Sequence, residues 1–230
     1  HSIEEKLHQS NDIVNGARGF FTASQLVEPS EWTKFVDAQN IKERFPGIQG
    51  LGFIKHLENE EIDEFVQFMN SYGIMDFHVK PEGKRDEYYV VTYLEPQDFR
   101  NLRAIGYDIY SESTRRQAAE IAEATGKTTI TGKIILVQET QEDIQSGFLM
   151  LQSVYDKKIS NYTMTERKEN ISGFVYAVFR MKDMINETLD PMLLENINLK
   201  IYDGDEEPQN LFFTNELVYN SENIIGTKTD

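Results

Sequence analysis

The chain contains no cysteine, which excludes disulfide bonds, thiolate catalysis and cysteine-ligated metal sites. It also has no apolar run that approaches the roughly 20 residues of a membrane-spanning helix. The sequence starts at His1 and Ser2, and no positively charged segment leads into an apolar stretch, so no signal peptide is predicted. These absences fit two interpretations, a processed cytosolic protein or a segment that lies between membrane helices.

Positive charge is scarce in this chain. Lys and Arg number 23 against 39 Asp and Glu, which gives a formal net charge of −16. Such a charge repels phosphate backbones and anionic lipid head groups, so we expect neither nucleic acid nor a membrane surface as a partner. Hydrophobic residues make up 39% and aromatic residues 11% of the 230 residues. This content is enough for a buried core, in one large domain or two small ones.

Motifs of catalysis and metal binding are missing as well. The four histidines lack the spacing of a zinc site, and no nucleophile elbow or phosphate-binding glycine loop is present. Acidic clusters at residues 58–64 and 203–207 suit a helix start and a turn without any metal. We therefore predict no catalytic residue, no metal site and no cofactor. A hydrolase that acts through paired carboxylates is kept as an alternative function.

Residues 3–24 are predicted to form one helix. Apolar or small residues recur at alternating spacings of four and three, which is the heptad pattern of a helix with one packed side. They are Ile3, Leu7, Ser10, Val14, Ala17, Phe21 and Ser24. This side can pack on the chain's own domain or against the same helix of a partner chain, and the pattern is too short to decide between the two.

The rest of the chain is predicted to form two antiparallel sheets flanked by helices, an α+β fold. The first unit, residues 28–157, has strands at 48–54, 133–138 and 148–155, a hairpin of 77–80 with 87–94, and helices that follow Pro29 up to Phe45 and that lie at 60–72 and 114–124. The second unit, residues 158–230, has a strand at 173–179, a helix at 182–189 and short strands at 197–201, 211–213 and 216–219.

Aromatic residues are frequent along the predicted strands of the first unit. In an antiparallel sheet such side chains line either a core or a ligand pocket, where Tyr and Thr hydroxyls supply polar anchors. The pattern leaves both interpretations open. The residues are Phe53, Tyr88, Tyr89, Tyr93, Tyr107 and Phe148.

An ordered series of motifs resembles the CHASE domain. It opens with ARGFFTAS at residues 17–24 and continues with RFPGIQGLGF at 44–53 and RDEYYVVTYLEP at 85–96. The remaining motifs are Gly106-Tyr107-Asp108 with Ser111 and Arg115, TGK at 125–127, Thr131-Gly132, and LVQE at 136–139. Each motif is short, but together they follow the family order from about residue 13 to about residue 180.

The resemblance implies the extracytoplasmic sensor domain of a membrane receptor, periplasmic or at the cell surface, with flanking membrane helices that this sequence lacks. The receptor would be a histidine kinase of a two-component system or a nucleotide cyclase. The resemblance also implies a stalk helix at residues 1–27, along which two chains form a homodimer. Two tandem PAS-like units would follow, a membrane-distal one at residues 28–157 and a proximal one at 158–230. The sensor domain itself would be non-catalytic.

A small-molecule ligand is expected in the distal unit, between its sheet and the helices and loops that cover it. The expected ligand contacts are Phe53, Tyr88, Tyr93, Glu95, Tyr107, Thr131 and Phe148. Thr131 matches a threonine that contributes to cytokinin binding in plant members of the family. The family's cytokinin-binding Asp falls at or next to Pro96, so cytokinin recognition is not predicted.

An anionic ligand would take its counter-charge from Arg18, Arg115 or Lys133. The alternative to the sensor is a protein-interaction or structural ectodomain without a small-molecule ligand.

Overall fold

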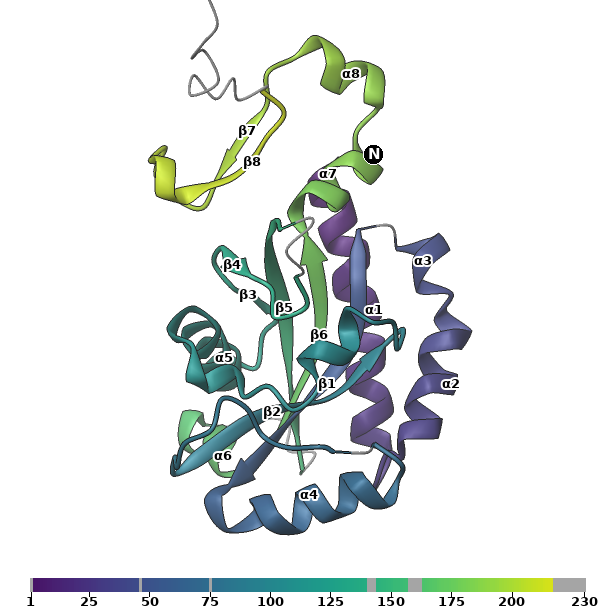
Figure 1. The fold of residues 1–230 in the computed structure, drawn as a ribbon, viewed down its shortest axis with the longest axis vertical. Coiled ribbons are helices and arrows are strands. Elements are labelled where there is room, and N and C mark those ends of the chain that lie inside the picture. The colour runs from purple at the N-terminus through teal and green to yellow at the C-terminus, as the bar shows by residue number, and fades with distance from the viewer. Residues whose placement is uncertain (1, 46, 75, 140–143, 157–162, 217–230) are drawn as a thin grey trace, which may run out of the picture.

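One antiparallel sheet forms the middle of the protein in the computed structural model, which describes residues 2–45, 47–74, 76–139, 144–156 and 163–216 (Figure 1). Its strands lie in the order β2-β1-β6-β5-β3, and β4 also pairs with β5. The strands are β1 (Ile48–Glu58), β2 (Glu87–Glu95), β3 (Thr129–Ile130), β4 (Ile134–Ile135), β5 (Ser146–Tyr155) and β6 (Ile171–Arg180).

The first helix, α1 (Ile3–Ala23), runs along one face of this sheet. Ser2 caps the helix, because its hydroxyl oxygen accepts a 3.1 Å hydrogen bond from Glu5 N. Ile13, Val14 and Ala17 are buried where α1 packs against β5 and β6. The helix predicted over residues 3–24 is confirmed, and its buried side packs on the chain's own sheet.

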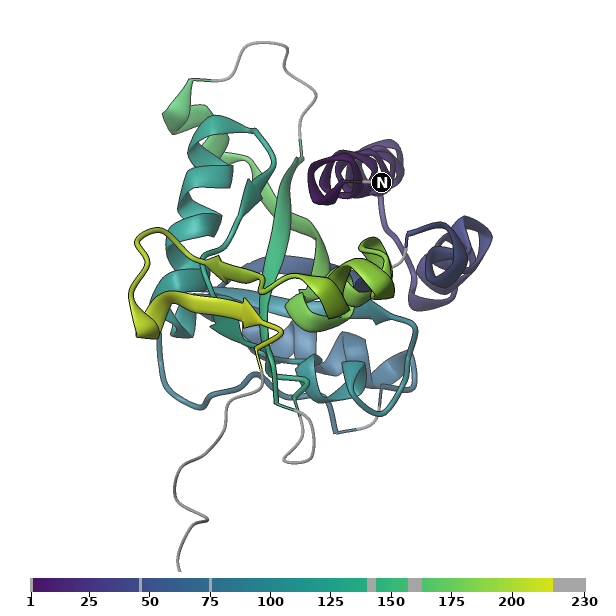
Figure 2. The same cartoon turned by 90° about the horizontal axis from the view of Figure 1, so that it is seen from above.

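Helices cover the sheet on both faces, as Figure 2 shows. On the face of α1 lie α2 (Pro29–Gln39), α3 (Ile41–Arg44) and α4 (Ile62–Ser71), whose apolar residues share one core cluster. The opposite face carries α5 (Ser113–Thr125), with α6 (Met164–Glu169) beside it. We call these the α1 face and the α5 face. Short 3-10 turns complete the connections: η1 (Asn59–Glu61), η2 (Asn101–Ala104) and η3 (Ile109–Ser111).

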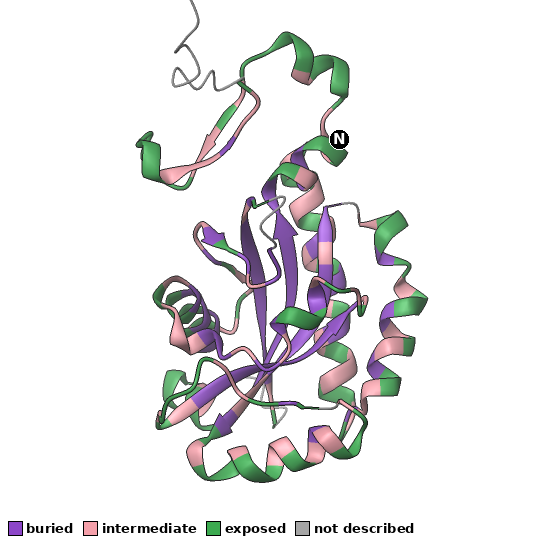
Figure 3. Ribbon diagram, in the orientation of Figure 1, coloured by how far each residue is buried: buried purple, intermediate pink, exposed green. Residues whose placement is uncertain are grey.

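Strand β6 corrects the predicted division of the chain. The strand predicted at 173–179 was assigned to a second unit that starts at residue 158, yet β6 pairs with β1 and β5 in the middle of the first sheet. Its side chains are apolar toward both faces and almost all buried (Figure 3). A strand that is apolar on both sides needs a cover on each, which a central position supplies. The first sheet therefore extends to Arg180.

The hairpin predicted between residues 77–80 and 87–94 is wrong. Strand β2 forms along 87–95 as expected, but its partner is β1, paired from Leu51–Glu95 to Glu58–Glu87. Residues 77–80 form no strand, and Lys80 instead makes an isolated bridge to Tyr107. The reason is length, because β1 offers β2 a long ladder and a four-residue segment offers far fewer hydrogen bonds.

After β6 the chain forms α7 (Met181–Thr188), α8 (Pro191–Asn196) and a two-stranded sheet of β7 (Lys200–Tyr202) and β8 (Leu211–Thr214), with the turn η4 (Pro208–Asn210) between the strands. The strand predicted at 216–219 lies mostly outside the described residues. The α+β class, the long N-terminal helix and the antiparallel sheets are thus confirmed. The described residues after Arg180 show a hairpin and two helices where a second PAS-like unit was predicted.

Candidate ligand-binding face

The seven residues expected to contact a ligand do not meet in one place. Phe53, Tyr88, Tyr93 and Phe148 belong to the core cluster of the α1 face. Tyr107 packs against the core of the α5 face, on the other side of the sheet. The structure therefore separates the aromatic walls that the sequence pattern grouped together.

The polar residues of that set are bonded to the protein itself. The Glu95 carboxylate, 4% exposed, accepts a 2.7 Å hydrogen bond from the Thr33 hydroxyl of α2. The Thr131 hydroxyl donates to Gly132 O at 2.9 Å and accepts from Leu149 N at 3.0 Å. Tyr88 donates its hydroxyl hydrogen to Gly83 O. In this conformation these groups join loops and helices to the sheet.

A small space lies on the α5 face, where four segments converge on β2, β5 and β6. Its volume is about 20 Å³. Loop residues come from η2, η3 and the segment after β4, and α5 contributes its first turn. The lining residues are Val91, Ala104, Tyr107, Ile109, Arg115, Leu136, Val137, Gln138, Leu149, Tyr176 and Val178. We call this space the α5-face cavity.

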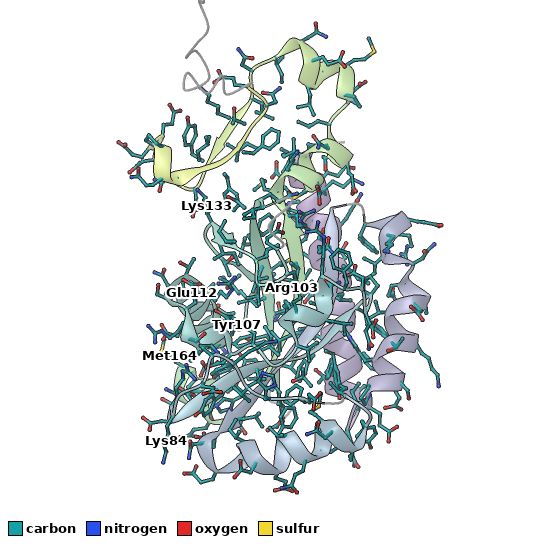
Figure 4. The ribbon with its side chains drawn as sticks, viewed as in Figure 1. Lys84, Arg103, Tyr107, Glu112, Lys133 and Met164 are labelled. Atoms are coloured by element: carbon teal, nitrogen blue, oxygen red, sulfur yellow. The ribbon has the colours of Figure 1, made fainter. Side chains whose placement is uncertain are left out.

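Gly106 brings the loop over this cavity into place. Its φ of +84° lies in the left-handed region, and a Cβ there would stand 2.1 Å from His78 O. This close approach lets Lys80 N donate to Gly106 O at 2.9 Å and Asp108 N donate to Lys80 O at 2.8 Å. Tyr107, held between these bonds, lines the cavity, and Figure 4 labels its place in the ribbon.

Arg115 forms the polar corner of the α5-face cavity. It is 5% exposed, and its guanidinium donates to Glu112 Oε2 at 3.0 Å and to Ile135 O at 2.7 Å. It also lies 5.5 Å from the ring centroid of Tyr107, a cation–π distance. Burial alone would raise the pKa of Glu112, but hydrogen bonds from Thr114 N and Arg115 N and the Arg115 charge lower it. The corner is therefore an ion pair whose guanidinium is held by Glu112 and by Ile135 O.

Tyr176 supplies a polar group that the protein leaves unsatisfied. Its side chain is 2% exposed, and within the described residues its hydroxyl has no hydrogen-bond partner. Its ring lies over Gly52 of the neighbouring strand, where a Cβ would stand 2.5 Å from Tyr176 Cε1. Burial raises the pKa of this phenol, so the hydroxyl stays protonated and can donate a hydrogen bond to a ligand.

A family model described as the CHASE domain matches residues 25–213 of this chain. The chain belongs to the CHASE family. CHASE domains are extracytoplasmic sensor modules of receptors and are generally non-catalytic. Among curated proteins, no relative matches this chain.

The described residues of this CHASE domain hold neither a membrane-spanning helix nor a metal-binding cluster. None of the helices formed by described residues is long and apolar enough to cross a bilayer. No group of three His, Cys, Asp or Glu side chains in that part of the chain could hold a metal ion.

Two buried carboxylates bond elements that surround the α5-face cavity in the CHASE domain. Asp108 is fully buried and accepts hydrogen bonds from Tyr89 N at 2.9 Å and Tyr110 N at 3.1 Å. Glu123 Oε2 accepts from the hydroxyls of Tyr89 at 3.3 Å and Tyr110 at 3.4 Å. Burial raises the pKa of both carboxyl groups. They position the loop and α5 around the cavity and make that arrangement sensitive to pH.

Sequence reasoning named Tyr107 as a contact and Arg115 only as a counter-charge, and it missed Gln138 and Tyr176. Gln138 lies within the LVQE motif, but nothing in its neighbours shows which way it faces. Tyr176 had a readable signal, because it is the one phenol in the apolar strand at 173–179. A buried hydroxyl in such a strand needs a hydrogen-bond partner, so Tyr176 could have been named as a candidate ligand contact.

Proposed function

We propose that this CHASE domain senses a small molecule bound in the α5-face cavity. The observation that carries the proposal is the Tyr176 hydroxyl, which is buried, protonated and without a partner in the described chain. Leaving such a group unsatisfied costs about 1–3 kcal/mol, a cost that a bound acceptor removes. Tyr107 and Arg115 line the same space and supply an aromatic ring and a cation.

Ligand binding requires this cavity to open. Its volume of about 20 Å³ holds no more than a water molecule, whereas small-molecule sites enclose about 300–1,000 Å³. The loop over it, residues 96–112, contains only short 3-10 turns. Because a ligand favours the open arrangement of this loop, binding shifts the domain between two conformations. This is the property that a sensor needs.

The signal has a physical route to the C-terminal hairpin. Leu136 and Gln138 of the cavity wall follow the β3–β4 loop, whose Lys133 N donates to Asp203 Oδ2 at 2.6 Å. The Lys133 ammonium also donates to Gln209 O at 2.8 Å. Figure 4 shows Lys133 below the hairpin of β7 and β8. A shift of the cavity wall would therefore move residues 203–209 through these two hydrogen bonds of Lys133.

We further propose that the full receptor is a homodimer paired through α1 and anchored by membrane helices. Its cytoplasmic effector would be of the histidine kinase or cyclase type. The heptad side of α1 packs on the chain's own sheet, so the pairing would use the side of α1 that the sheet leaves exposed.

A thermal-shift screen of metabolites tests the sensing proposal with two Tyr→Phe variants. Tyr176→Phe removes the unsatisfied hydroxyl, so we expect it to stabilise the ligand-free chain by about 1 kcal/mol and to abolish the shift given by a hit. Tyr88→Phe is the matched control, since its hydroxyl is bonded to Gly83 O and Arg85 N. It should lower stability and keep the ligand shift. A hit that stabilises wild type and Tyr176→Phe equally would exclude this site.

A further inference from the structure

A second and larger cavity lies on the opposite face of the sheet. Its volume is about 440 Å³, within the range of small-molecule sites. The end of α1 and the segment that follows it form one wall, α4 forms another, and β1, β2, β5 and β6 form the floor. The lining residues are Phe21, Thr22, Ala23, Ser24, Gln25, Leu26, Val27, Phe53, Lys55, Phe65, Phe68, Thr92, Tyr93, Val154, Tyr155, Asp156 and Ser172. We call it the α1-face cavity.

Aromatic rings make up much of its wall. Phe21 of α1 stacks on Phe53 of β1 with ring centroids 3.9 Å apart and planes 14° from parallel. Phe65 and Phe68 face the space from α4. The Tyr93 hydroxyl donates to Val27 O at 2.8 Å, so this residue offers its ring to the cavity and holds the chain after α1 in place. A flat apolar group suits these surfaces.

Lys55 is a charged residue on a side of β1 that otherwise carries core residues. Alternation along β1 puts it on the same side as Phe53 and Leu57, which are both core residues. One of its cross-strand neighbours is Gly173, which has no side chain to fill the space beside it. The Lys55 ammonium makes no hydrogen bond or ion pair in the described chain. No described carboxylate pairs with this cation, so an anionic group of a ligand in the cavity would meet a positive charge that has no partner in the described chain.

The rim limits the charge that a ligand can carry. Asp156 lines the same cavity, and its carboxylate accepts a hydrogen bond from the Ser172 hydroxyl. This negative group lies about two strands away from Lys55, since Lys55 pairs with Gly173 and Gly173 pairs with Val154. One anionic group can reach Lys55, whereas a second one would be repelled by Asp156.

We propose that the α1-face cavity is a second ligand site that takes a small aromatic monocarboxylic acid. The carboxylate pairs with the Lys55 ammonium, and the ring lies among Phe21, Phe53, Phe65 and Phe68. The occupant would touch the last turn of α1 and the segment that joins it to α2. The site is independent of the α5-face cavity, because the sheet separates the two.

Isothermal titration of the 230-residue chain tests this proposal with three probes: 3-phenylpropanoate, its neutral amide and the dicarboxylate phenylsuccinate. The ion pair should make the monocarboxylate bind about tenfold more tightly than the amide, and Asp156 should weaken the dicarboxylate. Lys55→Met should abolish the preference for the acid over the amide, and Lys55→Arg should restore it. Lys34→Met, a cation of α2 outside the cavity, is the matched control and should change nothing.

Several results would overturn the proposal: no binding of 3-phenylpropanoate to wild type, equal affinity for acid and amide, or an unchanged preference in Lys55→Met. Circular dichroism melts establish that the variants are folded. If Lys55→Met does not fold, the comparison of acid with amide on wild type decides alone. Tyr176→Phe should bind 3-phenylpropanoate like wild type, so failure of the α5-face site and failure of this one can be told apart.

Discussion

Replacing Glu139 by Gln is expected to damage the junction between the sheet and the C-terminal segment. Arg180, the last residue of β6, donates to Glu139 Oε1 at 2.8 Å from Nε and to Oε2 at 3.1 Å from Nη2. Its Nη1 also donates to Asp183 Oδ2 of α7 at 2.6 Å. The side chains of Arg180 and Glu139 are 6% and 4% exposed, while that of Asp183 is 36% exposed. Glu139 Oε2 also accepts from Gln145 N at 3.2 Å and lies 3.8 Å from Arg100 Nη1, so the two carboxylates differ both in burial and in their further partners.

We expect removal of these two charges to lower the free energy of unfolding by unequal amounts. Breaking a buried pair by neutralising one partner costs about 3–5 kcal/mol, because the other charge stays desolvated. Loss of a partly exposed pair costs at most about 1 kcal/mol. For a chain of this size, 1 kcal/mol corresponds to about 2–4 °C in Tm. We therefore expect Glu139→Gln to lower Tm by roughly 6–20 °C and Asp183→Asn by no more than about 4 °C.

Urea denaturation followed by circular dichroism, together with calorimetric Tm values, measures both variants under one set of conditions. The slope of unfolding free energy against urea should stay unchanged, which shows that the folded state keeps its compactness. Equal and small effects of Glu139→Gln and Asp183→Asn would refute the reasoning, since they would mean that water reaches Arg180 in the native state.

Two further predictions concern glycine positions and pH. Gly16→Ala should stabilise the chain by about 0.5–1 kcal/mol, because an added Cβ in mid-helix meets nothing within 4 Å. Gly52→Ala should destabilise it strongly, because its Cβ would stand 2.2 Å from Tyr93 O. Chemical denaturation of both variants measures these effects, and a Gly52→Ala variant as stable as wild type would contradict the packing. Burial raises the pKa of Glu123 in the folded state, so the folded chain holds this proton more tightly than the unfolded chain, and stability falls as pH rises from the ordinary carboxyl pKa through the raised one. Glu123→Gln should therefore gain stability relative to wild type as the pH rises above the ordinary carboxyl pKa, while Glu120→Gln, a change at an exposed position, should not. A pH-independent difference would show that Glu123 is charged at no cost.

The local elements of this domain were readable from sequence because they depend on near neighbours. The heptad pattern predicted α1, and β5 and β6 were recognised as apolar runs. Pairing was harder, because it joins residues far apart in the chain. The central place of β6 between β1 and β5 could have been inferred from its two apolar sides, but the order of units along the chain suggested a second sheet instead.

The candidate site was harder to predict than the fold because it depends on which face each side chain occupies. Tyr88 and Tyr93 are an odd number of residues apart, so simple alternation would put them on opposite faces. They share the α1 face because the register of β2 against β1 shifts between Phe53 and Ile54. Tyr107 comes from a loop, where no periodicity applies. The bulge thus brings Tyr88 and Tyr93 onto one face, and the loop places Tyr107 on the other.

A crystal structure of the chain with the strongest compound from the metabolite screen tests the central claim most directly. The account predicts the compound between α5 and strands β2 and β6, within hydrogen-bond distance of the Tyr176 hydroxyl and against the Tyr107 ring, with the loop at 96–112 displaced. A compound bound elsewhere, with the α5-face cavity closed and the Tyr176 hydroxyl still unpaired, would contradict it.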